Sequence, residues 1–163
     1  MMTESDHHPL NTNWKLWFHK TEEKDWTING FIKLAEFDNI MDYCIVMNSF
    51  EPVHVQNAML FIMRDNIQPL WEAEDNINGG SISFKIYRKE IYNCWNQLAN
   101  FLVGEKILKN EEDILKVNGI SISPKKTFSI MKIWFKDNEN NESKYLNNMN
   151  LFKYEDCIYK SHK

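Results

Sequence analysis

The sequence has little cysteine and no long apolar segment. Its three cysteines, Cys44, Cys94 and Cys157, are far apart, and no Cys-x-x-Cys pair occurs. This spacing supports neither a disulfide framework nor a zinc site, and it favours reduced thiols in core positions. No apolar run approaches the length of a membrane span, and the N-terminus lacks a signal-peptide pattern. We therefore expect a cytoplasmic protein with no membrane partner.

An excess of basic residues is also lacking. Lys and Arg number 19 against 23 Asp and Glu, giving a net charge of −4. This balance argues against non-specific binding along a nucleic-acid backbone, although it leaves room for a small basic pocket. The sequence contains no Gly-x-x-x-x-Gly-Lys loop, no Ser or Cys nucleophile motif, and no metal-ligand spacing among its histidines. We expect no catalytic residues, no metal and no cofactor, and hence no enzyme.

Apolar periodicity predicts an α+β domain over residues 8–163 behind a disordered tail at residues 1–7. The length suits one domain, and we expect a monomer. Alternating residues such as Trp14, Leu16 and Phe18 indicate strands. The stretch 81–87 alternates cleanly and is expected to pair with the apolar stretch 58–63. The expected strands cover residues 13–19, 58–63, 81–87, 117–123, 128–135 and 157–159.

Two or three helices are expected between these strands. Residues 89–103 form the clearest one, with a single apolar stripe that Gly104 should end as a C′ residue. Asp38 or Asn39 should cap a helix over residues 41–48, and a short helix is expected around 143–152. An antiparallel sheet with its helices on one face accounts for this pattern and leaves the other face free for a ligand. The stripe on the helix at 89–103 consists of Ile91, Trp95, Leu98 and Leu102.

The stretch 66–80 carries an unusual pair, Trp71 and Glu72. Pro69 excludes a helix interior or a central strand, so Trp71 is expected on a loop. A loop aromatic beside a carboxylate suits a flat ligand, because the ring stacks on its face and the carboxylate accepts hydrogen bonds from its edge. The alternative is a Trp that folds back onto the core beside a solvated Glu. A magnesium site at Glu72, Glu74 and Asp75 is a further, less favoured interpretation.

The order of these motifs resembles eukaryotic translation initiation factor 4E, the messenger-RNA cap-binding family. The resemblance covers nearly all of residues 8–162 and is divergent in places. It implies a curved antiparallel sheet with helices on its convex face and the cap in its concave face. The matching segments are His8-Pro-Leu10 with Trp14-x-x-Trp17-Phe18, Phe37-Asp38, Ile67-Gln-Pro-Leu-Trp-Glu72 with Asn78-Gly-Gly80, Trp95 through Glu105, Ile133-Trp134 and Tyr159-Lys-Ser-His162.

The resemblance implies a role for each residue of a base-binding site. Trp26 and Trp71 would sandwich the cationic 7-methylguanine, with cation–π contacts of about 0.5–2 kcal/mol and stacking of about 1–3 kcal/mol. Glu72 would accept hydrogen bonds from the guanine edge, and the Trp71 backbone N–H would donate to O6. Trp134 would lie against the methyl group.

The triphosphate end departs from the family pattern. The family has an arginine directly after the Gly-Gly pair, where this sequence has Ser81. Lys125, Lys126 and Lys132 are the phosphate candidates, and a merely solvated turn is the alternative. Lysine offers a point charge where arginine offers a fork, so a looser grip or a differently modified cap is expected.

The partner surface departs further. The family recruits the scaffold factor 4G, and is blocked by 4E-binding repressors, through a helical peptide that packs on a Trp and two Leu. Losing such anchors should weaken binding of an ordinary 4G peptide. A dedicated substitute partner is therefore an open alternative. The residues that correspond to the anchors are Cys44, Asn96 and Asn100, and the residues that keep part of the patch are Pro9, Ile40 and Val103.

Three functions remain open from the sequence. The first is a cap-binding module that serves translation initiation. The second is a repressor or sequestrant that binds caps without recruiting the usual scaffold. The third is a protein-interaction domain on the same fold that has lost cap binding, with Ser81 as its first sign. The family's C-terminal loop, which meets the nucleotide after the guanosine, is expected to be missing beyond Lys163.

Overall fold

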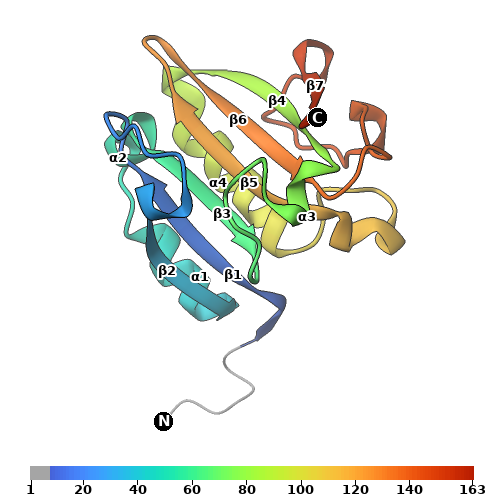
Figure 1. Ribbon diagram of the computed structural model, residues 1–163, viewed down its shortest axis with the longest axis horizontal. Coiled ribbons are helices and arrows are strands. Elements are labelled where there is room, and N and C mark those ends of the chain that lie inside the picture. Colours follow the sequence, from blue (N-terminus) through green and yellow to red (C-terminus); the bar gives the residue numbers. More distant parts are fainter. Residues whose placement is uncertain (1–7) are drawn as a thin grey trace.

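The computed structural model describes residues 8–163, so the predicted disordered tail at residues 1–7 lies outside the described residues. The described residues form a seven-stranded antiparallel sheet in the order β2-β1-β3-β5-β6-β4-β7 (Figure 1). This architecture confirms the predicted α+β class. The strands are β1 (Pro9–His19), β2 (Phe31–Asn39), β3 (Met59–Arg64), β4 (Gly80–Tyr87), β5 (Val117–Pro124), β6 (Phe128–Phe135) and β7 (Ile158–Ser161).

Helices cover one face of the sheet. Figure 1 shows α1 (Ile40–Asn48), α2 (Pro52–Asn57) and α4 (Ile91–Val103) behind the strands, while the short α3 (Glu74–Ile77) belongs to a loop on the opposite side. The first helix begins as predicted, because the Asn39 side chain accepts a hydrogen bond from the Asp42 N–H. None of the helices within residues 8–163 is long and apolar enough to cross a bilayer.

The helix α4 supplies much of the core. Its predicted stripe, Ile91, Trp95, Leu98 and Leu102, is at most 1% exposed. The helix ends at Val103 as predicted, with Gly104 as its C-cap residue. Gly104 is not the left-handed C′ residue, however, because its φ is −81 and the left-handed residue is Glu105 with φ 58. The Glu105 and Lys106 N–H groups donate to the carbonyls of Leu102 and Phe101, which is a Schellman ending.

A buried ion pair explains why a glutamate takes this strained backbone position. The carboxylate of Glu105 accepts hydrogen bonds from the guanidinium of Arg64, with Nη2 and Oε2 2.9 Å apart. The Arg64 guanidinium also lies 4.4 Å from the centroid of the Trp14 ring. The pair connects the end of α4 to β3, and each partner compensates for the desolvation of the other.

Alternation along the strands separates the core from the open face. On β4, Ile82 and Phe84 are buried under the helices, whereas Ser81, Ser83 and Lys85 belong to the other face. We call the face away from α1, α2 and α4 the open face. A small second cluster of buried residues lies there and forms a floor for the functional site. Its members are Phe31, Phe61, Met63 and Trp134.

The predicted pairing of residues 81–87 with 58–63 is wrong. The strand β4 pairs with β6 and β7, whereas β3 pairs with β1 and β5. Alternation determines which face a residue occupies, but it does not determine which strand lies next to it. Two later strands, β5 and β6, lie between the two segments in the sheet.

The predicted helix around 143–152 is also wrong. Only a single 3₁₀ turn forms, at Ser143–Tyr145. The Asn147 side chain donates to the carbonyls of Lys106 and Leu108, and such side-chain bonds compete with helix formation. Leu146 and Met149 are buried in the core from this irregular segment.

The expectation of core thiols holds for one cysteine. Cys94 is buried within α4, and burial raises its pKa to about 11. Cys157 is half-buried, and Cys44 is exposed on α1. The exposed position of Cys44 places its thiol on the outer surface of the helical layer.

Candidate functional site

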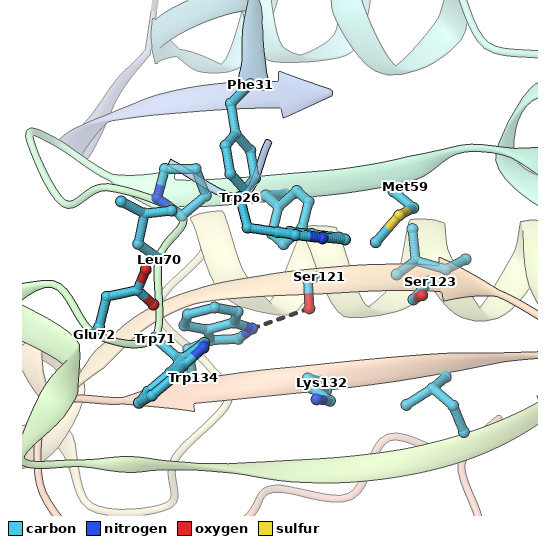
Figure 2. Close-up of a pocket in the computed structure, with 14 residues that line it drawn as sticks. Trp26, Phe31, Met59, Leu70, Trp71, Glu72, Ser121, Ser123, Lys132 and Trp134 are labelled. Atoms are coloured by element: carbon cyan, nitrogen blue, oxygen red, sulfur yellow. Dashed lines mark hydrogen bonds between the residues drawn. The ribbon is translucent and has the colours of Figure 1, made fainter. Parts of the chain in front are cut away.

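A cavity on the open face brings together the four residues predicted to bind the base. Trp26, Trp71, Glu72 and Trp134 all line it, together with Lys132 (Figure 2). We call it the tryptophan cavity. Figure 2 shows Trp26 on one side of the space and Trp71 and Trp134 on the other, with Glu72 beside Leu70.

The Trp26 ring is displayed on a loop and supported from below. It is 50% exposed, and it stacks on the fully buried imidazole of His19 with ring centroids 4.0 Å apart and planes inclined by 6°. The two ring nitrogens of His19 lie 2.9 Å from the carbonyl oxygens of Lys20 and Asp25. The imidazole thus connects the end of β1 to the loop that carries Trp26. Its importance was missed in the sequence, where His19 stands only as one of an alternating series.

Close backbone contact fixes the same loop at Gly30. A Cβ atom there would lie 1.8 Å from the carbonyl oxygen of Asp25, so a larger residue would displace the loop. The Asp25 carboxylate accepts hydrogen bonds from the N–H and the hydroxyl of Thr27, and these bonds lower the pKa of Asp25. The position of Trp26 therefore follows from local bonds on both sides of it.

The Trp71 loop is irregular, as predicted, and Trp71 is 55% exposed. Its anchor is Asn76, which is fully buried. The Asn76 side-chain amide donates to the carbonyls of Gln68 and Leu70, at 3.0 and 2.8 Å. Its side-chain oxygen accepts from the amide of Asn118 on β5 at 2.9 Å. These bonds hold the turn that presents Trp71 and Glu72, and an Asn soon after the Trp-Glu pair is the only sign of them in the sequence.

Trp134 belongs to the floor of the cavity. It is 6% exposed, and its indole N–H donates to the hydroxyl of Ser121 at 2.9 Å. Its ring centroid lies 6.2 Å from that of Phe61 in an edge-to-face arrangement. Bonded in this way, the indole presents an apolar surface to the space between the two exposed tryptophans.

A second cavity adjoins the first and contains the site's basic residues. Trp71, Lys132 and Trp134 line both cavities. The second, which we call the lysine cavity, is completed by Ser81, Ser83, Lys160, Ser161 and His162. Partial burial, with the nearby charges of Lys125 and Lys160, lowers the pKa of Lys132. Mutually repelling ammonium groups beside a cavity favour the binding of an anion.

Lys160 was not predicted as a site residue. It lies on β7, where it pairs across the strands with Ser81, and Ser81 in turn pairs with Trp134 on β6. Alternation puts Lys160 on the opposite face of β7 from Tyr159 and Ser161. Only the neighbours of β7 in the sheet show that the face of Lys160 is the open face. The Lys160 side chain is thus next to Ser81, the position at which the initiation factor 4E family has an arginine.

Ser81 is held by the C-terminal segment. Its hydroxyl lies 2.8 Å from Nε2 of His162, and Nδ1 of His162 lies 2.8 Å from the carbonyl oxygen of Asn76. Nδ1 must donate to a carbonyl, so in the neutral ring Nε2 accepts from the serine hydroxyl. Burial, followed by the charge of Lys132, lowers the pKa of His162, while the bond to Asn76 opposes that shift. One imidazole therefore links β4, the Trp71 loop and the end of the described chain.

The other predicted phosphate ligands lie apart from these cavities. Lys125 and Lys126 are exposed in the turn between β5 and β6, outside the lining of both cavities. The charge of Lys125 nevertheless reaches Lys132 and contributes to its lowered pKa. Of the three predicted lysines, only Lys132 lines the site.

Acidic residues near the site form no metal centre. Within residues 8–163, no group of three His, Cys, Asp or Glu side chains is arranged to hold a metal ion. Glu74 and Asp75 are exposed in α3, outside the lining of the tryptophan cavity. Glu72 is the carboxylate that faces the ligand space.

The predicted partner patch lies on the helical side of the sheet. Pro9, Ile40, Cys44 and Asn100 are exposed there, and Asn96 is half-buried. Val103 is 6% exposed, so it lies beneath this surface and offers little area for contact. The Asn100 side chain is engaged within the chain, because it accepts a hydrogen bond from the Tyr43 hydroxyl at 2.7 Å.

Comparison with known proteins decides the family. The model of the family described as "Eukaryotic initiation factor 4E" matches residues 9–163. The chain belongs to the eukaryotic initiation factor 4E family. Among curated proteins, initiation factor 4E of Saccharomyces cerevisiae is 29% identical over 143 residues, covering 81% of this chain and 63% of the yeast protein. The Candida glabrata factor is 30% identical over 140 residues, covering 79% of this chain and 63% of that protein. The chain therefore spans less than two thirds of the length of these relatives.

Solved structures of the initiation factor 4E family share the fold. A complex of Ascaris suum eIF4E-3 with m7G cap superposes with a TM-score of 0.72 at 20% identity, covering 85% of this chain and 78% of the other. A Schistosome eIF4E complexed with m7GpppG and 4E-BP gives a TM-score of 0.74 at 23% identity, covering 84% of this chain and 76% of the other. At these identities, the comparison establishes the architecture.

Proposed function

We propose that this protein binds the 7-methylguanosine cap of messenger RNA and serves translation initiation. The observation that carries the proposal is the tryptophan cavity, which has two half-exposed indoles, Trp26 and Trp71, with Glu72 at its edge. Exposing two large aromatic rings to water is unfavourable unless a flat ligand covers them. Relatives crystallised with m7G cap and m7GpppG support this choice of ligand.

Each base-contacting residue has a distinct role in the proposal. N7-methylation makes guanine cationic, so the ring is attracted to the faces of Trp26 and Trp71. The Glu72 carboxylate accepts from the guanine N1–H and exocyclic amine, and a cationic base makes these bonds charge-assisted. The Trp71 backbone N–H donates to O6. Trp134 offers its apolar surface to the methyl group, since its indole N–H already bonds to Ser121.

The triphosphate occupies the lysine cavity. Lys132 and Lys160 line it and bind the phosphates as point charges, and Lys125 and Lys126 contribute longer-range attraction from their turn. In this arrangement Lys160 supplies, from the neighbouring strand, the positive charge that Ser81 does not. No step of this function requires catalysis.

We further propose that a helical peptide docks on the patch of Pro9, Ile40 and Cys44. The relative complexed with 4E-BP supports a partner of the scaffold or repressor kind. Because Asn96 and Asn100 offer amides where the family presents leucines, a dedicated partner with polar groups at those places fits better than an ordinary 4G peptide. The alternative is that the protein has no such partner and binds caps as a repressor or sequestrant. The replacement of the family's Trp anchor by Cys44 would then reflect the loss of scaffold binding.

Affinity chromatography on immobilised 7-methyl-GTP tests the proposal. The purified protein should be retained and should elute with free 7-methyl-GTP but not with GTP. The Trp71→Ala variant should flow through, while Leu115→Ala, which alters an exposed apolar side chain outside both cavities, should behave as the wild type. Elution of wild type by GTP at equal concentration would contradict a site for the methylated base.

A further inference from the structure

A groove continues from the proposed cap site along β4. It is lined by Lys85 and Tyr87 on β4, by Phe128 on β6 and, opposite them, by residues such as Leu151 and Ile158. It also includes Ser83, which lines the lysine cavity, and Ile130, which lines the tryptophan cavity. The groove thus shares one lining residue with each cavity.

The geometry of the sheet sets the direction of this groove. Successive cross-strand pairs on the open face are Ser81–Trp134, Ser83–Lys132, Lys85–Ile130 and Tyr87–Phe128. Residues four apart on a strand are separated by roughly 13 Å. Phe128 therefore lies about that far beyond Lys132, on the side away from Trp134. A chain that leaves the lysine cavity along β4 would next meet Lys85 and then the aromatic pair.

Three side chains at this end have the chemistry of a nucleotide platform. Tyr87 is 55% exposed, and its backbone partner across the strands is Phe128. The Lys85 ammonium lies 4.5 Å from the centroid of the Phe128 ring and 5.4 Å from that of Tyr87. Aromatic faces with a cation beside them are the elements by which proteins bind single-stranded nucleic acid without reading its sequence.

We propose that this groove binds the first transcribed nucleotides of capped RNA, with Tyr87 and Phe128 stacking a base and Lys85 contacting a backbone phosphate. This inference rests on the proposed cap-binding function, because the cap delivers the RNA to the start of the groove. Once the cap is bound, contacts in the groove form at the high effective concentration of a tethered ligand.

Charge determines which part of the groove the RNA follows. Lys85 lies on β4 two residues beyond Ser83, the cross-strand partner of Lys132. The carboxylates Glu90 and Asp156 also line the groove, together with Lys153. The RNA backbone follows the row of lysines on β4, β6 and β7, away from the two carboxylates. A protein strand added to the outer edge of Phe84–Tyr87, which β7 leaves unpaired in the described chain, is the competing occupant.

The test compares 7-methyl-GTP with a capped five-nucleotide RNA by tryptophan-fluorescence titration at fixed salt. Wild type should bind the capped RNA about tenfold more tightly than 7-methyl-GTP, as expected for one stacked base. Tyr87→Ala should abolish this advantage, Lys85→Gln should reduce it, and Tyr87→Phe should retain it, because phenylalanine keeps the stacking face. The affinity for 7-methyl-GTP itself should stay within about twofold in all three variants. Lys109→Gln, an exposed lysine outside the lining of these cavities, is the charge-matched control.

The outcomes separate this inference from the proposed function. If wild type fails to bind 7-methyl-GTP, cap binding itself is contradicted. If 7-methyl-GTP binds but the capped RNA has no advantage, or the advantage survives in Tyr87→Ala, the RNA path is overturned while cap binding stands. That second result would favour a protein strand as the occupant of the groove.

Discussion

The imidazole of His19 lies face to face with the indole of Trp26, with ring centroids 4.0 Å apart and planes only 6° from parallel. His19 is fully buried, whereas half of Trp26 is exposed. One face of the indole is therefore supported within the protein, and the other is free for a ligand. The proposed cationic base would stack on that free face. Because His19 contacts the indole and not the base, it is a positioning residue for the site.

We predict that His19→Ala weakens binding of 7-methyl-GTP by about tenfold, because an unsupported Trp26 loses entropy on binding that the wild type does not. His19→Phe should recover part of the affinity, since it keeps a stacking face but loses both contacts to carbonyl oxygens. Titration by intrinsic fluorescence measures both effects, with His8→Gln as a control in an exposed histidine. Equal affinities in wild type and His19→Ala would contradict the positioning role.

The second prediction concerns the hydrogen bonds by which Asn76 holds the Trp71 loop. In Asn76→Leu, the carbonyls of Gln68 and Leu70 lose their donor, so unfolding free energy should fall by about 1–3 kcal/mol. Affinity for 7-methyl-GTP should fall as well, because Trp71 and Glu72 are no longer fixed. Urea denaturation and ligand titration check the two parts separately. Asn78→Ala, in an exposed position two residues away, should change neither quantity, and a similar loss there would show that the effect is not specific to the Asn76 bonds.

The lysines should contribute differently to the binding of 7-methyl-GTP, according to whether they line the cavities. Lys132→Gln and Lys160→Gln should each weaken binding of 7-methyl-GTP by roughly tenfold, as expected for a bond between charged groups, and should leave binding of 7-methylguanosine unchanged. Lys126→Gln should have a smaller effect, since Lys126 lies outside the lining of both cavities. Calorimetric titrations at two salt concentrations measure these differences. A larger effect at Lys126 than at Lys160 would place the phosphates at the β5–β6 turn instead.

Stability should depend on pH through His162. Its pKa is lowered chiefly by burial, so the folded protein binds fewer protons at this site than the unfolded chain does. The stability that the neutral His162 ring contributes to the folded protein is fully present above the unfolded pKa of about 6.5. It is lost as the pH falls from there toward the lower pKa of the folded state. Urea midpoints measured from pH 7.5 to 5.5 should fall in wild type and change less in His162→Gln. Parallel pH profiles for the two proteins would rule out this assignment.

The sequence predicted those parts of the molecule that depend on local pattern. The apolar stripe of α4, the Asn39 cap and the loop around Trp71 follow from neighbouring residues alone, because spacing and proline chemistry act within a few positions. The family resemblance pointed to Trp26, Trp71, Glu72 and Trp134, and the fold brings all four to one cavity. Their individual roles stay predictions.

What the sequence could not predict depends on contacts between distant segments. The neighbours of β4 are decided by strands that follow it by thirty or more residues, so alternation gave the right face and the wrong partner. Lys160 became a candidate only once β7 was placed beside Ser81. His19 and Asn76 act through bonds to backbone carbonyls, and no residue pattern marks such bonds in advance. The left-handed backbone of Glu105 is compensated by its ion pair with Arg64, which lies 41 residues earlier.

The most direct test of the central claim is titration of the purified protein with 7-methyl-GTP and, separately, with GTP, following intrinsic tryptophan fluorescence. The two ligands differ in one methyl group and the positive charge that it confers on the base. The account predicts strong quenching by 7-methyl-GTP and at most weak quenching by GTP, because only the methylated base is cationic between Trp26 and Trp71. Equal quenching by both ligands, or none by either, would contradict the cap-binding function.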